Sequence, residues 1–504
     1  MSSLSLPTEL TPKHLLYILG AVFLYWVLPL LYGLLFSPLR KVPGPFLARV
    51  TRLWEFHSLW KGHSNLDFIS LHEKYGPVVR VAPNRYSFSR PEDVKTIYAL
   101  GGKFFKSDFY SPMLTGDPLV DNVFPTIDDK EHRDRRRKIS SLYTMSAMVT
   151  YEEAVDAMTT VLTKKLRQFA NEGRQLHLPH FMQSYAFDVI GQITFNQNFG
   201  MMESECDRTG ITKGVRRTLD YLSHIGLLPE LHPWITLLRK AMGQSGKARA
   251  LAVHTFSQID RLREENVKPA ENTEYTTFLQ KLLDMQKSKK VTMVNIQDAT
   301  GSNLGAGSDT TAITLSSSLY YLYKHPEKLA KLRHELDTMT AEGRISDPIT
   351  FQEAQNMPYL QAVIKEGFRM HPAVGTILPR VVPKGGAKLA GINFPEGTHV
   401  GANSWVLHYD KDGFGPDPEV YRPERWLRSE VDGEAQNGMM FTFGGGSRAC
   451  IGKNIGLLEV NKVLPQFVRQ FNLVLDDKAT METYCSWFVY PTFHVRIKWR
   501  EEVE

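Results

Sequence analysis

A single cysteine lies in a glycine-rich loop near the C-terminus. Residues 443–452 read FGGGSRACIG, and the stretch 453–471 that follows has apolar residues at helical spacing. Cys450 is therefore predicted to lie just before a helix N-terminus, whose free N–H groups and partial positive charge favour a thiolate. The glycines allow the backbone to approach a flat ligand closely, and Arg448 can supply a cation for an anionic group on that ligand.

Other roles for Cys450 compete with a ligand role. A free cysteine is commonly only a small buried hydrophobe, but that reading leaves three glycines and an arginine unexplained. A zinc site would need more Cys or His ligands at short spacing, and none lies nearby in the sequence. A catalytic nucleophile would need a histidine base, which the sequence alone does not exclude.

A second candidate site lies in residues 291–323, which contain no proline and are predicted to form one long helix. Within it, residues 305–311 read GAGSDTT. Each glycine in a helix interior costs about 1 kcal/mol relative to alanine, so the two glycines need a reason. Close packing against a neighbouring element is one reason, and room for a small bound ligand beside a local distortion is the other.

Two clusters of charge are less informative. Glu366 and Arg369 share a face of the predicted helix 359–370, but such pairs are common on protein surfaces. A basic run is typical of a solvated helix face and also suits docking of an acidic partner; it comprises Arg133, Arg135, Arg136, Arg137 and Lys138. Nucleic-acid binding is not predicted, because no broad basic surface or known reader motif accompanies the run.

Composition favours one large folded domain. The 504 residues are 42% hydrophobic with a net charge of +6, and no linker, repeat or low-complexity block divides them. Three cysteines are too few for a disulfide framework, which indicates a reducing compartment.

The N-terminus carries the predicted membrane anchor. Residues 15–36 contain no charge and would span about 33 Å as a helix, enough to cross a bilayer. Arg40 and Lys41 follow at once, so the positive-inside rule places the rest of the chain in the cytosol. We therefore divide the chain into a tail (1–14), a transmembrane anchor (15–36), a proline-rich hinge (37–46) and a catalytic domain (47–504).

The cysteine loop resembles the signature of the cytochrome P450 family. Its pattern Phe-x-x-Gly-x-Arg-x-Cys-x-Gly is matched at every position, by Phe443, Gly446, Arg448, Cys450 and Gly452. The resemblance implies that Cys450 is the metal ligand, binding the iron of haem b through its thiolate. It also implies that Phe443 packs near the sulfur and that Arg448 pairs with a haem propionate.

The same resemblance assigns roles in the long helix and the charged pair. Asp309 and Thr310 correspond to the acid–alcohol pair that delivers protons during O2 activation, and both are predicted to be catalytic. Glu366 and Arg369, with Arg425 of the sequence PERW, correspond to a network that supports folding rather than chemistry.

Further propionate contacts are implied at His132 and Arg136, which match a Trp/His-x-x-x-Arg helix pattern, and at Arg380 in a predicted strand. A plain surface position is the alternative for each. Residues 108–124, 303–310, 373–378 and 487–489 correspond to the pocket lining. They are largely apolar and include Phe109, Tyr110, Phe124, Ile377 and Phe488, so a lipophilic substrate is expected.

The implied fold is mainly α (α+β): a helical prism with a small β-rich region, plus the N-terminal transmembrane helix. Strands are expected near 77–89, 377–402 and 485–499.

The implied function is a monooxygenase that uses O2 and NADPH-derived electrons. The chain has no dinucleotide-binding loop with a second domain, so the electrons must come from a separate NADPH-cytochrome P450 reductase, or partly from cytochrome b5. Details of the sequence resemble the fungal pisatin-demethylase and benzoate-hydroxylase branch, which favours a terpenoid, polyketide or alkaloid intermediate as substrate at the endoplasmic reticulum membrane. The alternatives are a haem-thiolate isomerase or dehydratase, and a non-enzymatic haem-binding membrane protein.

Overall fold

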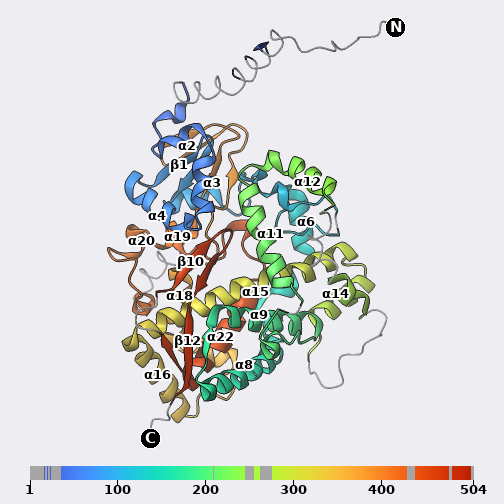
Figure 1. Cartoon of the computed structure of the whole chain (residues 1–504), viewed down its shortest axis with the longest axis vertical. Helices are drawn as coiled ribbons and strands as arrows, with labels where there is room; N and C mark the ends of the chain where they lie inside the picture. The colour runs from blue at the N-terminus through green and yellow to red at the C-terminus, as the bar shows by residue number, and fades with distance from the viewer. Residues whose placement is uncertain are drawn as a thin grey trace.

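The computed structural model (Figure 1) describes residues 36–500 except 118, 208, 244–254, 262–274, 428–437 and 476–479, together with residues 16, 17, 20 and 23. In this part of the chain helices predominate, as predicted. The helices are α2 (Phe46–Val50), α3 (Leu53–Trp60), α4 (Ser64–Tyr75), α5 (Pro91–Ile97), α6 (Asp129–Ile139), α7 (Met145–Val149), α8 (Glu152–Glu172), α9 (Leu178–Phe195), α10 (Met201–Ser204), α11 (Ile211–Ile225), α12 (His232–Ala241), α14 (Phe278–Lys287), α15 (Met293–Lys324), α16 (Pro326–Ala341), α17 (Phe351–Gln355), α18 (Pro358–Met370), α19 (Ser404–His408), α20 (Lys411–Phe414) and α22 (Lys453–Gln470).

The long helix α15 crosses the middle of the molecule and packs against α9, α22 and α18 (Figure 1). It begins at a capping box in which Thr292 and Asn295 satisfy each other's backbone N–H groups. The helices predicted at 291–323, 359–370 and 453–471 are confirmed as α15, α18 and α22 within two residues at each end. The buried faces of α8, α9, α15 and α22 form the largest apolar core.

The strands are β1 (Val78–Ala82), β2 (Arg85–Phe88), β3 (Phe105–Lys106), β4 (Gln175–His177), β5 (Arg380–Val381), β6 (Ala387–Leu389), β7 (Ile392–Phe394), β8 (His399–Gly401), β9 (Phe471–Leu475), β10 (Glu482–Cys485), β11 (Val489–Thr492) and β12 (His494–Trp499). The largest sheet has the order β1-β2-β8-β5-β3, with only β2 and β8 parallel. Strands were expected in all three predicted regions and are found there. The sequence prediction missed β3, β4 and β9, which are short or follow a helix directly, so period-two alternation is hardly visible in them.

The predicted anchor at 15–36 lies almost entirely outside the described residues. Among the residues that are described, no helix is both long and apolar enough to cross a bilayer. In the predicted hinge, a 3-10 helix, η1 (Pro38–Lys41), is followed by non-helical residues 42–45. The Pro43 carbonyl accepts a hydrogen bond from the Arg80 backbone of β1, which ties this segment to the sheet.

Candidate active site

The cysteine loop is closed by its own backbone. The Cys450 N–H donates to the Phe443 carbonyl at 2.8 Å, and a short 3-10 helix, η7 (Gly446–Arg448), lies between them. Gly446 has φ of +66°, and a Cβ there would lie 2.1 Å from the Tyr98 carbonyl oxygen. Gly452 is the N-cap of α22. The sequence therefore placed Cys450 correctly, directly before a helix, and Gly446 is required by conformation and by space.

The Cys450 sulfur accepts hydrogen bonds from the N–H groups of Gly452 and Lys453, and Arg136 lies within electrostatic range. Burial nevertheless raises the pKa of the thiol, since it outweighs these stabilising contacts. Cys450 keeps accessible surface although protein atoms crowd its sulfur. An added positive charge beside the thiol, such as a metal ion, would favour the thiolate.

The middle of α15 has an accessible strip on an otherwise mostly buried helix. Ala306 is exposed and Gly305 and Thr310 are half-buried, and the Thr310 hydroxyl donates to the Ala306 carbonyl at 2.9 Å. At the next residue, Thr311, the helix lies beside α22, where a Cβ at Gly456 would be 3.9 Å from the Thr311 hydroxyl oxygen. The cysteine loop leads directly into α22, so the strip and the thiol belong to the same region of the molecule.

Gly307 lies against α9, where a Cβ would come within 3.3 Å of the Ile190 side chain. Close packing is thus the reason for this glycine. Gly305, beside exposed Ala306, lies at the accessible strip.

The Asp309 side chain points away from Thr310. It is buried between α9 and β11, accepts a hydrogen bond from the Gln183 side-chain amide at one carboxyl oxygen, and accepts one from the Tyr490 hydroxyl at the other, at 2.9 Å. Burial raises the pKa of Asp309. The two predicted catalytic residues are neighbours in sequence, but their side chains occupy different environments.

A cluster of basic residues lies around the cysteine loop. The structure brings together four of the predicted propionate ligands and one lysine that sequence reasoning missed: His132, Arg136, Arg380, Arg448 and Lys106. Burial and the neighbouring arginines lower the pKa of His132 to about 3, so this imidazole is neutral.

Few acids balance this cluster. Among the ion pairs of the described residues, the only carboxylate bound to any of the five is Asp129, at 2.6 Å from Arg448. Arg380 has no carboxylate partner among the ion pairs of the described residues, and it donates to the carbonyls of Leu378 and Pro379, which directly precede it. Buried cations with so few acidic partners fit a ligand that carries two carboxylates, as haem does.

Lys106 is buried and lies against two aromatic rings. Its ammonium donates to the Phe124 carbonyl and lies 3.8 Å from the Tyr110 ring centroid and 4.1 Å from that of Phe124. Burial, followed by Arg380, lowers its pKa well below the usual value. The residue lies in the two-residue strand β3, and only its surroundings in space distinguish it from a surface lysine.

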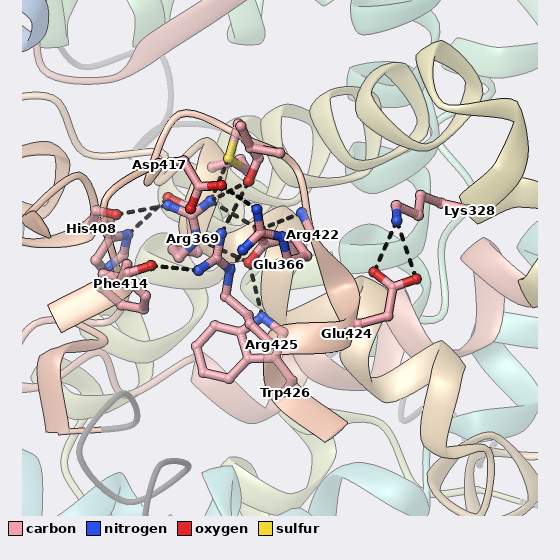
Figure 2. Close-up of polar contacts among 12 residues, drawn as sticks. Lys328, Glu366, Arg369, His408, Phe414, Asp417, Arg422, Glu424, Arg425 and Trp426 are labelled. Atoms are coloured by element: carbon pink, nitrogen blue, oxygen red, sulfur yellow. Dashed lines mark hydrogen bonds and ion pairs between the residues drawn. The ribbon is translucent and has the colours of Figure 1, made fainter. Parts of the chain in front are cut away.

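The predicted Glu–Arg–Arg network is assembled in the core (Figure 2). Glu366 receives two hydrogen bonds of 2.9 Å from Arg369 and one of 3.1 Å from Arg425. Trp426, which was not predicted, adds a fourth donor to the same carboxylate at 2.9 Å. Arg369, Arg425 and Trp426 therefore all donate to one buried carboxylate, and this group of four residues is called the charge centre at Glu366 below.

His408 connects this network to the cysteine loop. Its carbonyl accepts from Arg369 at 2.8 Å, and its Nε2 accepts from the Phe441 N–H at 2.8 Å (Figure 2 shows the first contact). Burial, and then Arg369, lowers the pKa of His408 to about 3, which keeps Nε2 free to accept. Phe443 packs edge-on against Phe368 of α18, 5.3 Å between ring centroids. The network thus contacts the cysteine-loop segment through His408, and α18 contacts it through Phe368.

Aromatic side chains from the predicted pocket segments gather beside α15. Phe109, Tyr110, Trp487 and Phe488 share one apolar cluster with Ile313. Phe109 stacks on Trp487 at 5.8 Å, and exposed Phe124 meets the edge of Trp487 at 5.7 Å. Ile377 does not join this cluster. It packs instead with Phe68 and Val79 on the sheet side, because its side chain lies on the other face of its segment.

Comparisons with known proteins agree with this geometry. The family model described as Cytochrome P450 matches residues 43–499. The chain is 42% identical to a pisatin demethylase of Fusarium vanettenii, over 95% of this chain and 94% of the relative. It is 34% identical to a cytochrome P450 monooxygenase of Aspergillus terreus, over 86% and 90% of the two chains. A further relative is the cytochrome P450 monooxygenase gsfF of Penicillium aethiopicum, which is 33% identical over 95% and 97%.

Proposed function

The chain belongs to the cytochrome P450 family of monooxygenases, and from that premise we propose that it oxidises a lipophilic small molecule at a haem ligated by Cys450. The observation that carries the proposal is an accessible thiol held before a helix N-terminus, beside a cluster of basic residues with few acids. Neither a nucleophilic cysteine nor a structural cysteine accounts for the cations.

Each group of residues has a distinct task in this proposal. Cys450 would ligate the iron, and the five clustered basic residues would hold the two propionates. When bound, haem supplies the activation of O2 and the transfer of one oxygen atom to substrate. Thr310 holds a proton on Oγ1 at the accessible strip of α15. The carboxyl group of Asp309, the preceding residue, holds a second proton that can replace it. The aromatic cluster excludes water from the substrate side.

The substrate is proposed to be an apolar secondary-metabolite intermediate such as a terpenoid, polyketide or alkaloid. The aromatic cluster around Trp487 supports a lipophilic molecule. The name of two relatives, pisatin demethylase, supports a methyl group as one position of attack. Hydroxylation of an oxygen-bound methyl carbon produces a hemiacetal that releases formaldehyde, so demethylation requires no chemistry beyond hydroxylation.

The electron donor is proposed to be an NADPH-cytochrome P450 reductase, with cytochrome b5 as a further donor. The α6 helix supports this proposal, because it carries the propionate residues on one face and exposed basic residues on another. The exposed side chains are Lys130, Arg133, Arg137 and Lys138. An acidic flavoprotein docked on this helix would lie on the haem side of the protein.

The proposed location is the endoplasmic reticulum membrane, with the catalytic domain in the cytosol. Besides the uncharged segment 15–36, a set of exposed apolar side chains supports membrane contact. It comprises Phe46, Leu47, Leu53, Trp234, Leu237 and Leu238 from α2, α3 and α12, and is called the apolar face below. An ion pair between Arg52 and Glu230 holds the start of α3 beside the start of α12.

The decisive experiment is a reduced carbon-monoxide difference spectrum of the purified protein and of Cys450→Ala. The wild type should show the thiolate band that gives the family its name, and the variant should lose it. A folded wild-type protein without that band would overturn the cofactor and the function together.

A second arm tests the cation cluster. Lys106→Met keeps the length of the side chain and removes its charge, so haem should transfer to an excess of a haem-scavenging protein roughly tenfold faster. Lys103→Met, at an exposed position three residues away, should leave the transfer rate unchanged. Equal rates for the two variants would remove Lys106 from the propionate site.

A further inference from the structure

Asp309 is held in a cradle built from two other elements. Its carboxyl group lies between Gln183 of α9 and Tyr490 of β11, whereas Thr310 faces the accessible strip around Ala306. Successive residues of a helix point about 100° apart, so the two side chains cannot meet while both cradle bonds are made. The Asp309 carboxyl group must break at least one of these two hydrogen bonds before it can pass a proton to Thr310.

The two partners differ in what they can do. Gln183 offers the carboxyl an N–H donor, which suits the ionised form. The Tyr490 hydroxyl can donate to a carboxylate or accept from a protonated carboxyl group, so it serves both forms. Among the ion pairs of the described residues none includes Asp309, and burial raises the pKa of its carboxyl. A proton can therefore reside on the oxygen that faces Tyr490.

Tyr490 also lies at the inner end of a polar strip that reaches solvent. The exposed guanidinium of Arg216 lies 4.0 Å from the centroid of the Tyr490 ring. One turn further along α11, Asp220 accepts a hydrogen bond of 3.1 Å from the hydroxyl of Tyr484, which is partly exposed. Tyr484 stands directly opposite Tyr490 in the β10–β11 hairpin. Polar side chains of α11 and of the hairpin are thus placed in succession between the protein surface and the buried acid.

We propose that Tyr490 is the residue through which the Asp309 carboxyl exchanges its proton with solvent, and that Tyr490 and Gln183 hold this carboxyl in a resting position away from Thr310. Tyr490 gives its hydroxyl proton to the facing carboxyl oxygen and takes one from water on the Arg216 side, so the phenol is regenerated. Both are positioning residues, and their role rests on the proposed monooxygenase function, in which Thr310 is the destination of the proton.

The first test reads the carboxyl group directly. In the infrared spectrum of the holoenzyme, the carbonyl stretch of protonated Asp309 is the band that Asp309→Asn removes. Tyr490→Phe should shift the titration midpoint of this band to higher pH, because the ionised form loses a hydrogen-bond donor. Tyr323→Phe is the matched control, since it removes a buried hydroxyl bond of 2.6 Å to Phe471 and should leave the midpoint unchanged.

The second test measures coupling, the amount of oxidised product formed per NADPH consumed. Tyr490→Phe should lower coupling roughly tenfold, with more hydrogen peroxide released and a larger solvent isotope effect, while Tyr323→Phe keeps the wild-type ratio. Unchanged coupling in Tyr490→Phe would overturn the proposal whether or not the band shifts. Failure of the proposed function itself would be seen separately, as a wild-type protein without the thiolate band.

Discussion

Glu459 lies on α22 with none of its surface exposed, and neither of its carboxyl oxygens has a hydrogen-bond partner among the described residues. Burial raises its pKa well above the usual value. The folded state therefore keeps the proton at pH values where the unfolded chain has released it. The contribution of Glu459 to the free energy of unfolding is greatest below the ordinary glutamate pKa and falls by about 1.4 kcal/mol per pH unit above it, until the folded pKa is reached.

Glu459→Gln should remove this dependence, because glutamine has nearly the same shape and carries no titrating group. The variant should melt at a higher temperature than wild type at pH 8, and the difference should shrink toward pH 5. Thermal unfolding of both proteins across this range is the measurement, with exposed Glu327→Gln as control. Parallel curves for wild type and Glu459→Gln would mean that the buried carboxyl is ionised in the folded protein.

Among elements, α18 depends on the charge centre at Glu366 for its attachment to the segment 423–427 and to α19. Glu366→Gln leaves Arg369 and Arg425 buried without a counter-charge, and should destabilise the protein by about 3–5 kcal/mol. The readouts are the melting temperature and the fraction of purified protein that carries haem. Glu342→Gln, whose ion pair with Arg344 is exposed, should change stability by less than about 1 kcal/mol. Similar losses of stability in both variants would show that the network around Glu366 contributes no more to stability than an exposed ion pair.

The elements also show where sequence patterns were sufficient. Long helices with unbroken periodicity, such as α15 and α22, were predicted nearly to the residue, because helix formation depends on local spacing and caps. The two-residue strand β3 left no periodic signal, and Lys106 was missed with it. Gln183 and Tyr490 were missed for a different reason: they meet Asp309 only through packing of α9 and β11 on α15.

At the scale of the whole molecule, the helices that carry the apolar face, α2, α3 and α12, lie toward the same end of the protein (Figure 1). A chain that lacks residues 1–36 should therefore still bind vesicles of phosphatidylcholine and phosphatidylserine in a flotation assay. Replacing both Trp234 and Leu238 by serine in that truncated chain should weaken the binding about tenfold, because each loses buried apolar contact with lipid.

Leu100→Ser provides the control for that experiment, since Leu100 is exposed near the cysteine loop and outside the apolar face. It should leave flotation unchanged. Equal flotation of the truncated parent and its doubly substituted variant would show that the apolar face does not contact the membrane.

The sequence by itself determined the family, the mainly helical fold and the glycine-rich turn before α22, because each depends on residue types at fixed short spacings. It also identified Asp309 and Thr310 as a pair of neighbours. Only the tertiary structure decided that their side chains part, that Gly307 serves packing against Ile190, and that a strand lysine joins the arginines around Cys450. These features depend on which distant segments meet and on how completely they exclude water, and neither is written in the local order of residues.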